Sequence, residues 1–507
     1  MGLGINQGKA GNAMAFKKRR GLRVQVLKRK GRIKLRKKIK IKTKRKMKRK
    51  INNSKLKVRK ARTRTRIRQN KIRKTRKIKY VKPKSIQKKQ SENVTVMDSN
   101  LLVPSTLHGK VKVCMLVIQH PFVDARIFKK EAKSLLKAGY DVTLVVPRNK
   151  KGFLYDIEGT SYTDKFLEKK FVYEGIKIVT YKPVIPSFDY MKNAVHSGNF
   201  KAFKDPLYLA GLAEKADIYH VHEVFSLYSG IGIKRTLKSL YGKSVKLIYD
   251  SHEITEGSEQ YVSLFKQMIK ETDSVITVSD SMKDWYKRAF PLLPVEVIYN
   301  SPHLDNDFEP KKYTSKGLVA GFIGWMTKEK ANKDKMLKIT ELCRKHMDFK
   351  FKILGGVRGS KIDFPDSMKN YIIQCGWVKF ERIPQHLKDV DIGWIDFDMN
   401  TPVHPLNYKV ALPNKFFSFL NSGIPILVNN CSEMANFVRS NQCGLVVDGE
   451  NPSAEDYEKA ILYLQTHRRK LVEMSKNARR IMVETYSWEH MEKRMVQLYE
   501  NLCKVQL

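Results

Sequence analysis

Two series of short apolar segments, separated by helical patterns, run through the larger, C-terminal part of the chain. Residues 111–118 are continuously apolar, as a strand buried on both faces requires. Apolar residues then recur at helical spacing from Phe128 to Leu136, and Gly139 stands where a helix commonly ends. Residues 141–147 form the next apolar run. This order predicts parallel strands that are joined by right-handed crossovers.

The remaining apolar runs fall into two sets, each of which is typical of a doubly wound sheet. The first set continues with residues 217–222, 245–250, 274–279 and 295–299. The second set comprises residues 318–324, 349–354, 371–375, 391–395, 425–429 and 444–447. We therefore predict an α/β protein with two Rossmann-like domains that face each other across a cleft. The expected boundaries are 110–303 for the N-terminal domain, 304–485 for the C-terminal domain, and 486–507 for an amphipathic helix that packs back across the hinge.

The charge of the chain is concentrated at its N-terminus. The formal net charge is +51, from 100 Lys and Arg against 49 Asp and Glu. Residues 1–91 hold 40 of these basic residues and no acid, which leaves 60 basic and 49 acidic residues, or +11, for the rest. Self-repulsion is strong and little apolar surface is available to bury, so we expect a disordered basic tail over residues 1–91. Residues 92–109 are expected to form a linker.

The composition of the tail indicates a polyanionic partner but does not say which polyanion. Clustered Lys and Arg bind polyanions by releasing counterions or through surface potential. An anionic membrane surface, an acidic polymer or nucleic acid would each serve, and a merely solvated tail is the alternative. Phe16 and Tyr80 are the only aromatic residues in the tail, so stacking on nucleic-acid bases has little support.

Cysteine usage and hydropathy point to the cytoplasm. The six cysteines are scattered and form no C-x-x-C pair, which favours a reducing compartment over disulfides or a zinc finger. No stretch reaches the roughly 18–20 apolar residues that span a bilayer, and the basic N-terminus lacks the apolar core of a secretory signal. We expect a cytoplasmic protein that its tail can hold at the inner membrane surface or at another polyanionic surface.

Polar side chains follow the predicted strands of the first domain, where the ligands of doubly wound sheets bind. They are His120, Asp124 and Arg126 after the first strand, His220, His222 and Glu223 around the next, and Asp250, His252 and Glu253 after a third. A His beside a Glu is suited to orienting a sugar hydroxyl. The competing interpretation is that these residues only cap strands. A zinc site built from His220, His222 and His252 is weakly supported, because no helical His pair or Cys accompanies them.

In the second domain, two features predict a site for an anion. Gly324 follows a strand, where the backbone can approach a phosphate closely, and Lys328 and Lys330 come next. Asn414 and Lys415 open a predicted helix, with Asn414 as its expected cap and Lys415 adding charge to the free N–H groups. Solvated loop lysines are the competing interpretation for Lys328 and for the nearby Lys333.

An acidic pair, Asp396 and Asp398, follows the strand at residues 391–395. A metal-held nucleotide would need such a pair, but the spacing often arises by chance. We therefore expect no metal ion at this place.

The order of these motifs resembles retaining glycosyltransferases of family 4, which have the GT-B fold. The motifs are HPFVDARIFKKEAKSLLKAGYDVTLVVP, ADIYHVHE, LIYDSHE, SVITVSDSM, VIYNSP, LPNKFFSFLNSGIPILVNNCSEM and the closing SWE helix, over about residues 111–502. The resemblance implies transfer of a sugar from a nucleotide-sugar donor with retention, without a cofactor or a metal ion. The implied catalytic residues are His222, Glu223, Asp124 and Arg126, with His120 and His252 on the acceptor side. The implied donor-binding residues are Gly324, Lys328, Lys330, Asn414, Lys415, Ser418 and Glu433.

One departure from the family pattern bears on the donor. The family places two Glu residues eight positions apart around the helix, and the second holds the ribose of the nucleotide. Here Val410 and Ser418 occupy the matching positions. Val cannot accept a hydrogen bond, and Ser carries no charge, so donor binding is rebuilt, weakened or lost.

We therefore predict a hexosyltransferase-type enzyme that acts on a polymeric, lipid-linked or anionic acceptor, whether a glycan, a lipid-linked molecule or a protein. The alternative is a non-catalytic polyanion-binding or coat-type protein with a degenerate glycosyltransferase domain. A nucleic-acid-processing enzyme has support only from the tail. An epimerase or a phosphorylase could use the same fold.

Overall fold

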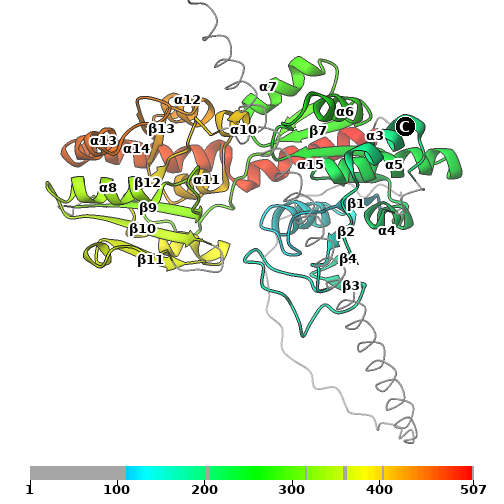
Figure 1. Cartoon of the computed structure of the whole chain (residues 1–507), viewed down its shortest axis with the longest axis horizontal. Coiled ribbons are helices and arrows are strands. Elements are labelled where there is room, and N and C mark those ends of the chain that lie inside the picture. Colours follow the sequence, from blue (N-terminus) through cyan, green and yellow to red (C-terminus); the bar gives the residue numbers. More distant parts are fainter. Residues whose placement is uncertain (1–109, 201–204, 314–316, 358–361, 402–404, 505–507) are drawn as a thin grey trace, which may run out of the picture. The chain divides into compact units, whose positions relative to one another are not determined.

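A computed structural model describes residues 110–200, 205–313, 317–357, 362–401 and 405–504. All of them fall within one compact unit, residues 105–507. The predictions of a disordered tail and a linker lie outside the described residues. Within the described part, the fold is α/β with two sheets, as predicted (Figure 1).

The first sheet has eight strands in the order β3-β4-β2-β1-β5-β6-β7-β8. Its strands are β1 (Lys112–Leu116), β2 (Asp141–Pro147), β3 (Lys170–Tyr173), β4 (Ile176–Tyr181), β5 (Ile218–Val221), β6 (Lys246–Ser251), β7 (Ser274–Thr277) and β8 (Val295–Val297). All neighbours pair in parallel except β3 with β4. Side chains of β1 alternate between two cores, with Val113 and Met115 on one face and Cys114 and Leu116 on the other. Burial on both faces explains why this strand is continuously apolar.

The helices of this half are η1 (Ile127–Ala132), α2 (Lys133–Lys137), α3 (Phe188–Ser197), α4 (Pro206–Glu214), α5 (Val224–Tyr241), α6 (Glu259–Ile269) and α7 (Asp280–Ala289). The helix predicted from the spacing of Phe128 and Leu136 is therefore present. Its first part, η1, is a π-helix, which the apolar spacing did not predict. Such turns are rare and occur frequently at functional sites.

The β3–β4 hairpin was missed in the sequence prediction. Its two-residue turn, Glu174-Gly175, has positive φ at both positions, 48° and 80°, as a type I′ turn requires. The signal was present as a Glu-Gly pair between Phe171 and Ile178, which face each other across the hairpin. It was overlooked because the flanking segments are short and rich in Lys.

The second sheet has six parallel strands in the order β11-β10-β9-β12-β13-β14. They are β9 (Leu318–Trp325), β10 (Phe349–Gly356), β11 (Ile372–Gly376), β12 (Ile392–Ile395), β13 (Ile426–Asn429) and β14 (Gly444–Val447). Every apolar run predicted for this half is a strand. The helices are α8 (Lys333–Cys343), η3 (Asp366–Met368), η4 (Phe380–Arg382), α9 (Ile383–His386), α10 (Pro405–Val410), α11 (Asn414–Asn421), α12 (Ser432–Asn441), α13 (Ala454–Thr466), α14 (Arg468–Ile481) and η5 (Met482–Tyr486).

The last helix, α15 (Trp488–Lys504), packs on the first half of the chain, against η1, α2 and β8 (Figure 1). Met491, Met495 and Tyr499 are buried in the same apolar core as Val113 and Met115 of β1. The indole Nε1 of Trp488 donates to Ser134 Oγ at 3.0 Å. The final residues of the chain thus complete the core of its first sheet. No helix within the described residues is both long and apolar enough to cross a membrane.

Candidate functional site

The carboxyl ends of β1, β5 and β6 bring the predicted polar residues of the first half together. A buried ion-paired group lies at the centre. Arg126 Nε is 2.7 Å from Glu131 Oε1, and Arg126 NH2 is 3.1 Å from Asp250 Oδ2. All three side chains are almost entirely shielded from solvent. NH1 of Arg126 also donates to the carbonyl oxygen of Ile298 at 2.8 Å, so the guanidinium is held by several elements.

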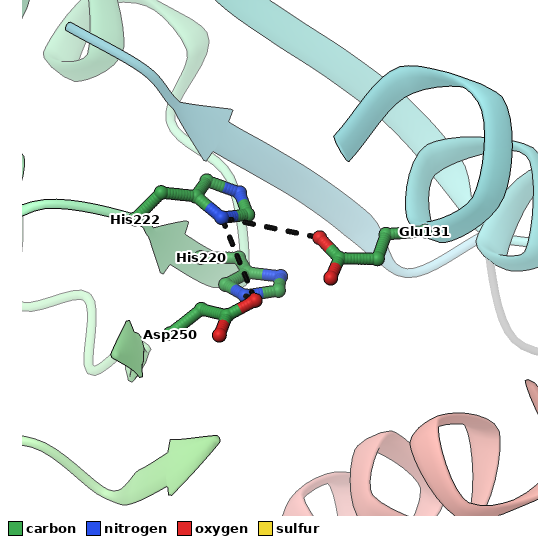
Figure 2. A group of neighbouring side chains, drawn as sticks. All are labelled: Glu131, His220, His222 and Asp250. Carbon is green, nitrogen blue, oxygen red and sulfur yellow. Dashed lines mark ion pairs between the residues drawn. The ribbon is translucent and has the colours of Figure 1, made fainter. Parts of the chain in front are cut away.

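Two histidines, His220 of β5 and His222 just after this strand, lie against this group. The rings of His220 and His222 stack with centroids 4.4 Å apart, which confirms that they share one face of the strand. His222 Nδ1 lies 3.6 Å from Asp250 Oδ2 and 3.9 Å from Glu131 Oε2 (Figure 2). The Tyr499 hydroxyl, from α15, is 2.8 Å from His220 Nδ1. His222 is buried rather than open to solvent, which places it beneath the strand ends.

A second, more accessible group surrounds His120. Its Nδ1 is 3.2 Å from Asp124 Oδ2, and its Nε2 is 3.3 Å from Glu223 Oε1. The side chain of His120 is 28% exposed, against 11% for Asp124 and 15% for Glu223. The ring of His252 packs edge-on to it with centroids 5.1 Å apart. These four predicted residues therefore form one polar surface beside the buried ion pairs.

Electrostatics differ between the two groups. Burial opposes protonation of His120, but Asp124 and Glu223 outweigh it and raise the pKa of His120 to about 9. Burial raises the pKa of Glu223 to about 7. In the buried group, burial and the neighbouring His220 lower the pKa of His222 well below its ordinary value. His120 is thus the cation of the accessible group, and His222 is a neutral ring.

In the second half, the loop after β9 and the first turn of α11 approach each other. The Nζ of Lys415 lies 4.3 Å from the ring centroid of Phe322 and 5.6 Å from that of Phe397. Burial and the positive charge of Lys330 lower the pKa of Lys415 to about 7, against the attraction of Asp396. Gly324 has φ +110°, and a Cβ placed there would meet no atom within 4 Å. The charges of Lys330 and Lys415 therefore interact, and the Gly324 backbone, two residues after Phe322, has open space beside it.

The other predicted donor residues are placed differently. Asn414 is the first residue of α11 and not its cap, because Pro413 holds the cap position and no side chain caps the helix. The Ser418 hydroxyl donates to the Asn414 carbonyl at 3.0 Å, within its own helix. Lys328 is exposed, and Lys333 donates to the Asp363 carbonyl at 3.0 Å. The two residues of the acidic pair have different partners: Asp396 binds Lys335 and the Tyr457 hydroxyl, and Asp398 accepts from the Asn400 N–H.

Glu433 and Val410 contact the first half of the chain. The carboxylate of Glu433 accepts hydrogen bonds from the backbone N–H and the hydroxyl of Ser281 on α7. Val410 is buried in an apolar cluster with Ile254, Val278 and Met282. Val410, which stands where the family has its first Glu, thus joins the two halves by apolar contact.

Comparison with known proteins identifies the first half. Residues 125–305 match the family model described as Glycosyltransferase Family 4. These residues form a family 4 glycosyltransferase domain. The match includes Arg126, Glu131, the two stacked histidines and Asp250, so the buried cluster belongs to the family 4 domain. The resemblance inferred from the sequence is confirmed.

Solved structures extend the likeness beyond the family 4 domain. Sucrose-phosphate synthase from Thermosynechococcus elongatus is similar with a TM-score of 0.55 and 14% identity, over 78% of this chain and 100% of that chain. A glycosyltransferase from Rickettsia africae gives 0.54 and 15%, over 78% and 100%. Anabaena Alr3699/HepE in complex with UDP-glucose gives 0.53 and 12%, over 77% and 99%. The fold is therefore GT-B, as predicted. No curated protein sequence matches the chain.

Sequence reasoning missed two members of the buried cluster in the family 4 domain, Glu131 and Tyr499. Glu131 lies within the predicted helix, next to the apolar face formed by Phe128 and Leu135. An acid in such a position is the signal that could have revealed it. Tyr499 lies 279 positions after its partner His220, so no local pattern relates the two residues.

Proposed function

We propose that the chain transfers a sugar from a nucleotide-sugar donor, with retention at the anomeric carbon and without a metal ion at the diphosphate. The observation that carries this proposal is that Lys330 and Lys415 lie close enough for their charges to interact, at the end of β9 and the start of α11. In this reaction the bond from the anomeric carbon to the diphosphate breaks, and the nucleoside diphosphate leaves with the electron pair. Fixed cations stabilise that developing charge.

The first turn of α11 supports the same assignment. No side chain caps this helix, and although the Phe416 N–H donates to the Pro413 carbonyl at 2.9 Å, the helix dipole favours an anion at this end. Lys415 is the second residue of this helix. Among the described residues, neither Lys330 nor Lys415 has an ion pair with a carboxylate within 4.0 Å. Their charge is therefore available to a bound diphosphate.

On the other side, the accessible group of the family 4 domain would face the sugars. His120 carries a positive charge, and Glu223 and Asp124 hold it in place through both ring nitrogens. The carboxylate oxygens of Asp124 and Glu223 in such a group can accept hydrogen bonds from sugar hydroxyls. His222, Arg126 and Asp250 lie beneath it and would act by positioning this surface. The acceptor would be polymeric, lipid-linked or anionic.

The proposal predicts pH-dependent binding of a nucleoside diphosphate. A bound diphosphate raises the pKa of Lys415, so above pH 7 binding requires uptake of a proton. UDP affinity is therefore expected to be constant below pH 7 and to fall by up to about tenfold per pH unit above it. The Anabaena structure with UDP-glucose makes UDP the first nucleotide to test. Calorimetric titration of the full chain between pH 6 and 9 measures this dependence.

Two variants sharpen the experiment. Lys415→Ala is expected to weaken UDP binding and to remove the pH dependence. Lys333→Ala is the matched control, because its ammonium is bonded to the Asp363 carbonyl, and it should bind UDP as the natural chain does. ADP, GDP and CMP are tested in parallel. If none of these nucleotides binds, or if Lys415→Ala binds as tightly as Lys333→Ala, the proposed donor site is wrong.

A second candidate function has its own support. Val410 is buried between the two halves and has no hydrogen-bonding group, and the Ser418 hydroxyl donates within its own helix and carries no charge, so the two carboxylates of the family pattern are missing. A non-catalytic, polyanion-binding protein with a degenerate domain would show these features. It predicts no nucleotide binding and no release of nucleoside diphosphate from any sugar donor with acceptor present.

A further inference from the structure

The buried cluster of the family 4 domain contains polar atoms that the described part of the chain does not satisfy. Oε2 of Glu131 has no hydrogen-bond donor, whereas Oε1 is ion-paired with Arg126 Nε at 2.7 Å. Nε2 of His220 and both ring nitrogens of His222 also lack a hydrogen-bond partner. A buried polar group without a hydrogen-bond partner destabilises the folded chain. Several of them in one place indicate that a partner belongs there.

The geometry of these atoms suits a metal ion. One ligand atom from each of Glu131, His220, His222 and Asp250 lies within 4.8 Å of the other three. Three of the separations are 3.6 Å, 3.7 Å and 3.9 Å. These distances are too long for hydrogen bonds. Tetrahedral ligands about 2.1 Å from a zinc ion lie about 3.4 Å apart, so a shift of a few tenths of an ångström would complete a coordination shell.

We propose that Glu131 Oε2, His220 Nε2, His222 Nδ1 and Asp250 Oδ2 bind one divalent transition-metal ion of the zinc class. The four side chains converge from η1, from the carboxyl end of β5 and from β6, as Figure 2 shows. Two imidazole nitrogens and two carboxylate oxygens form a donor set that zinc accepts. The ion would fasten the π-helix to the ends of two strands.

Contacts around the four ligands orient them for this role. Tyr499 is 2.8 Å from His220 Nδ1, and the tautomer in which Nδ1–H donates to the Tyr499 oxygen leaves the Nε2 lone pair facing Asp250. Such outer hydrogen bonds commonly fix the rings of metal-binding histidines. Arg126 holds the other oxygen of Glu131, Oε1, at 2.7 Å. It leaves Oε2 facing His222.

The charges are compatible with a dication. The two carboxylates of Glu131 and Asp250 face one guanidinium, that of Arg126, so the group carries an excess negative charge when both are ionised. Arg126 already touches Asp250 Oδ2 at 3.1 Å and would share that oxygen with the ion. The competing occupant is a proton on one of the carboxylates. Metal content distinguishes these two possibilities.

This inference is independent of the proposed donor site. The ion would be enclosed beneath the strand ends, whereas the diphosphate is proposed at Lys330 and Lys415 in the other half. His222 would be a ligand of the metal and would not contact the sugar. UDP binding and metal content are separate measurements, so either proposal can fail without the other.

The test measures zinc in the purified full chain. Protein produced in zinc-supplemented medium is expected to contain one zinc ion per chain by mass spectrometry. A strong chelator should lower the thermal unfolding midpoint, and added zinc should restore it. His222→Gln is expected to lose the zinc and the response to chelator. Tyr499→Phe should fold and retain zinc with an affinity about tenfold weaker, because only an outer hydrogen bond is lost.

His346→Gln is the matched control, since this exposed histidine lies in the other half and pairs with Glu458. It should keep its zinc and its response to chelator. If His222→Gln does not fold, the chelator response of the natural chain and the affinity of Tyr499→Phe still decide the question. The proposal is overturned if the natural chain holds no zinc and its midpoint is unchanged by chelator and by zinc.

Discussion

At the scale of single residues, His120 shows how a partly exposed group can carry a stable charge. Its two ring nitrogens face two carboxylates, Asp124 and Glu223, from opposite sides. Asp124 is itself held by backbone N–H groups of Arg126 and Ile127, at 2.7 Å and 3.0 Å. Asp124 is therefore held in position by the backbone, and His120 is oriented by the carboxylates on either side of it.

Because the pKa of His120 is raised to about 9 in the folded chain, its protonation contributes stability. The contribution is complete below the unfolded pKa of about 6.5 and disappears as the pH rises through about 9. The natural chain should thus be more stable than His120→Gln by about 2 kcal/mol at pH 6, and this advantage should vanish by about pH 9.5. Urea unfolding of both proteins between pH 6 and 9.5 measures it. A constant difference over this range would show that the charge of His120 is not responsible.

At the scale of elements, strands β9 and β10 carry glycines near their carboxyl ends, Gly324 and Gly355, that allow a close backbone approach. Gly355 has φ +112°, and a Cβ at this position would lie 2.3 Å from the Gly324 carbonyl oxygen. The two residues are partners in the register of the parallel pair. The open backbone at Gly324 therefore depends on a second glycine in the next strand.

Gly355→Ala is expected to destabilise the chain by more than strain in its own φ angle explains. Gly449 supplies the control, because its φ is +91° and a Cβ there would meet no atom within 4 Å. Both alanine variants share the conformational cost of about 1 kcal/mol, and only Gly355→Ala adds the collision with backbone. Denaturant unfolding of the two variants is the measurement. If Gly355→Ala and Gly449→Ala lose the same stability, β9 and β10 can move apart at no cost in free energy.

Most elements follow from the sequence, and the exceptions have physical causes. The continuous apolar run at 111–118 and the helical spacing from Phe128 to Leu136 predict β1 and the helix after it. The π-turn at η1 escapes such reasoning, because it shifts side chains by one position within a helix that otherwise keeps its apolar face. The hairpin at residues 170–181 escapes because its strands are short.

The site was predictable in part, for the same kind of reason. Polar residues after strands mark the region, so His120, His222 and Lys415 could be chosen from sequence. The burial of each side chain could not be predicted from the sequence. His222 lies beneath the surface, whereas His120 reaches it. The hydrogen bond from the Ser418 hydroxyl to the Asn414 carbonyl could not be predicted either, because it depends on the hydroxyl rotamer and not on the pattern of residue types.

At the scale of the whole molecule, residues 1–91 and the rest of the chain differ sharply in charge. The first part carries 40 basic residues without an acid, and the remainder carries a net +11. We propose that the tail binds a polyanionic surface and thereby keeps the protein near its acceptor. Lys and Arg near an anionic membrane contribute about 1 kcal/mol each, and this attraction is screened by salt.

The full chain should therefore bind vesicles that contain phosphatidylserine, and a chain of residues 92–507 should not. Raising the salt concentration from 50 to 200 mM should reduce binding of the full chain by at least about a hundredfold, because many counterions are involved. Vesicle sedimentation measures both effects, with phosphatidylcholine vesicles as the control. Equal binding by the two chains would exclude the tail as the attachment site.

The position of α15 has a consequence for how the protein is made. Trp488, Met491 and Tyr499 fill the core beside β1, so the first sheet lacks part of its interior until the last segment of the chain has been synthesised. Domains of most proteins acquire structure in the order of translation. Here the first sheet needs residues 488–504, and a nascent chain that stops before Trp488 would leave the core beside β1 unfilled.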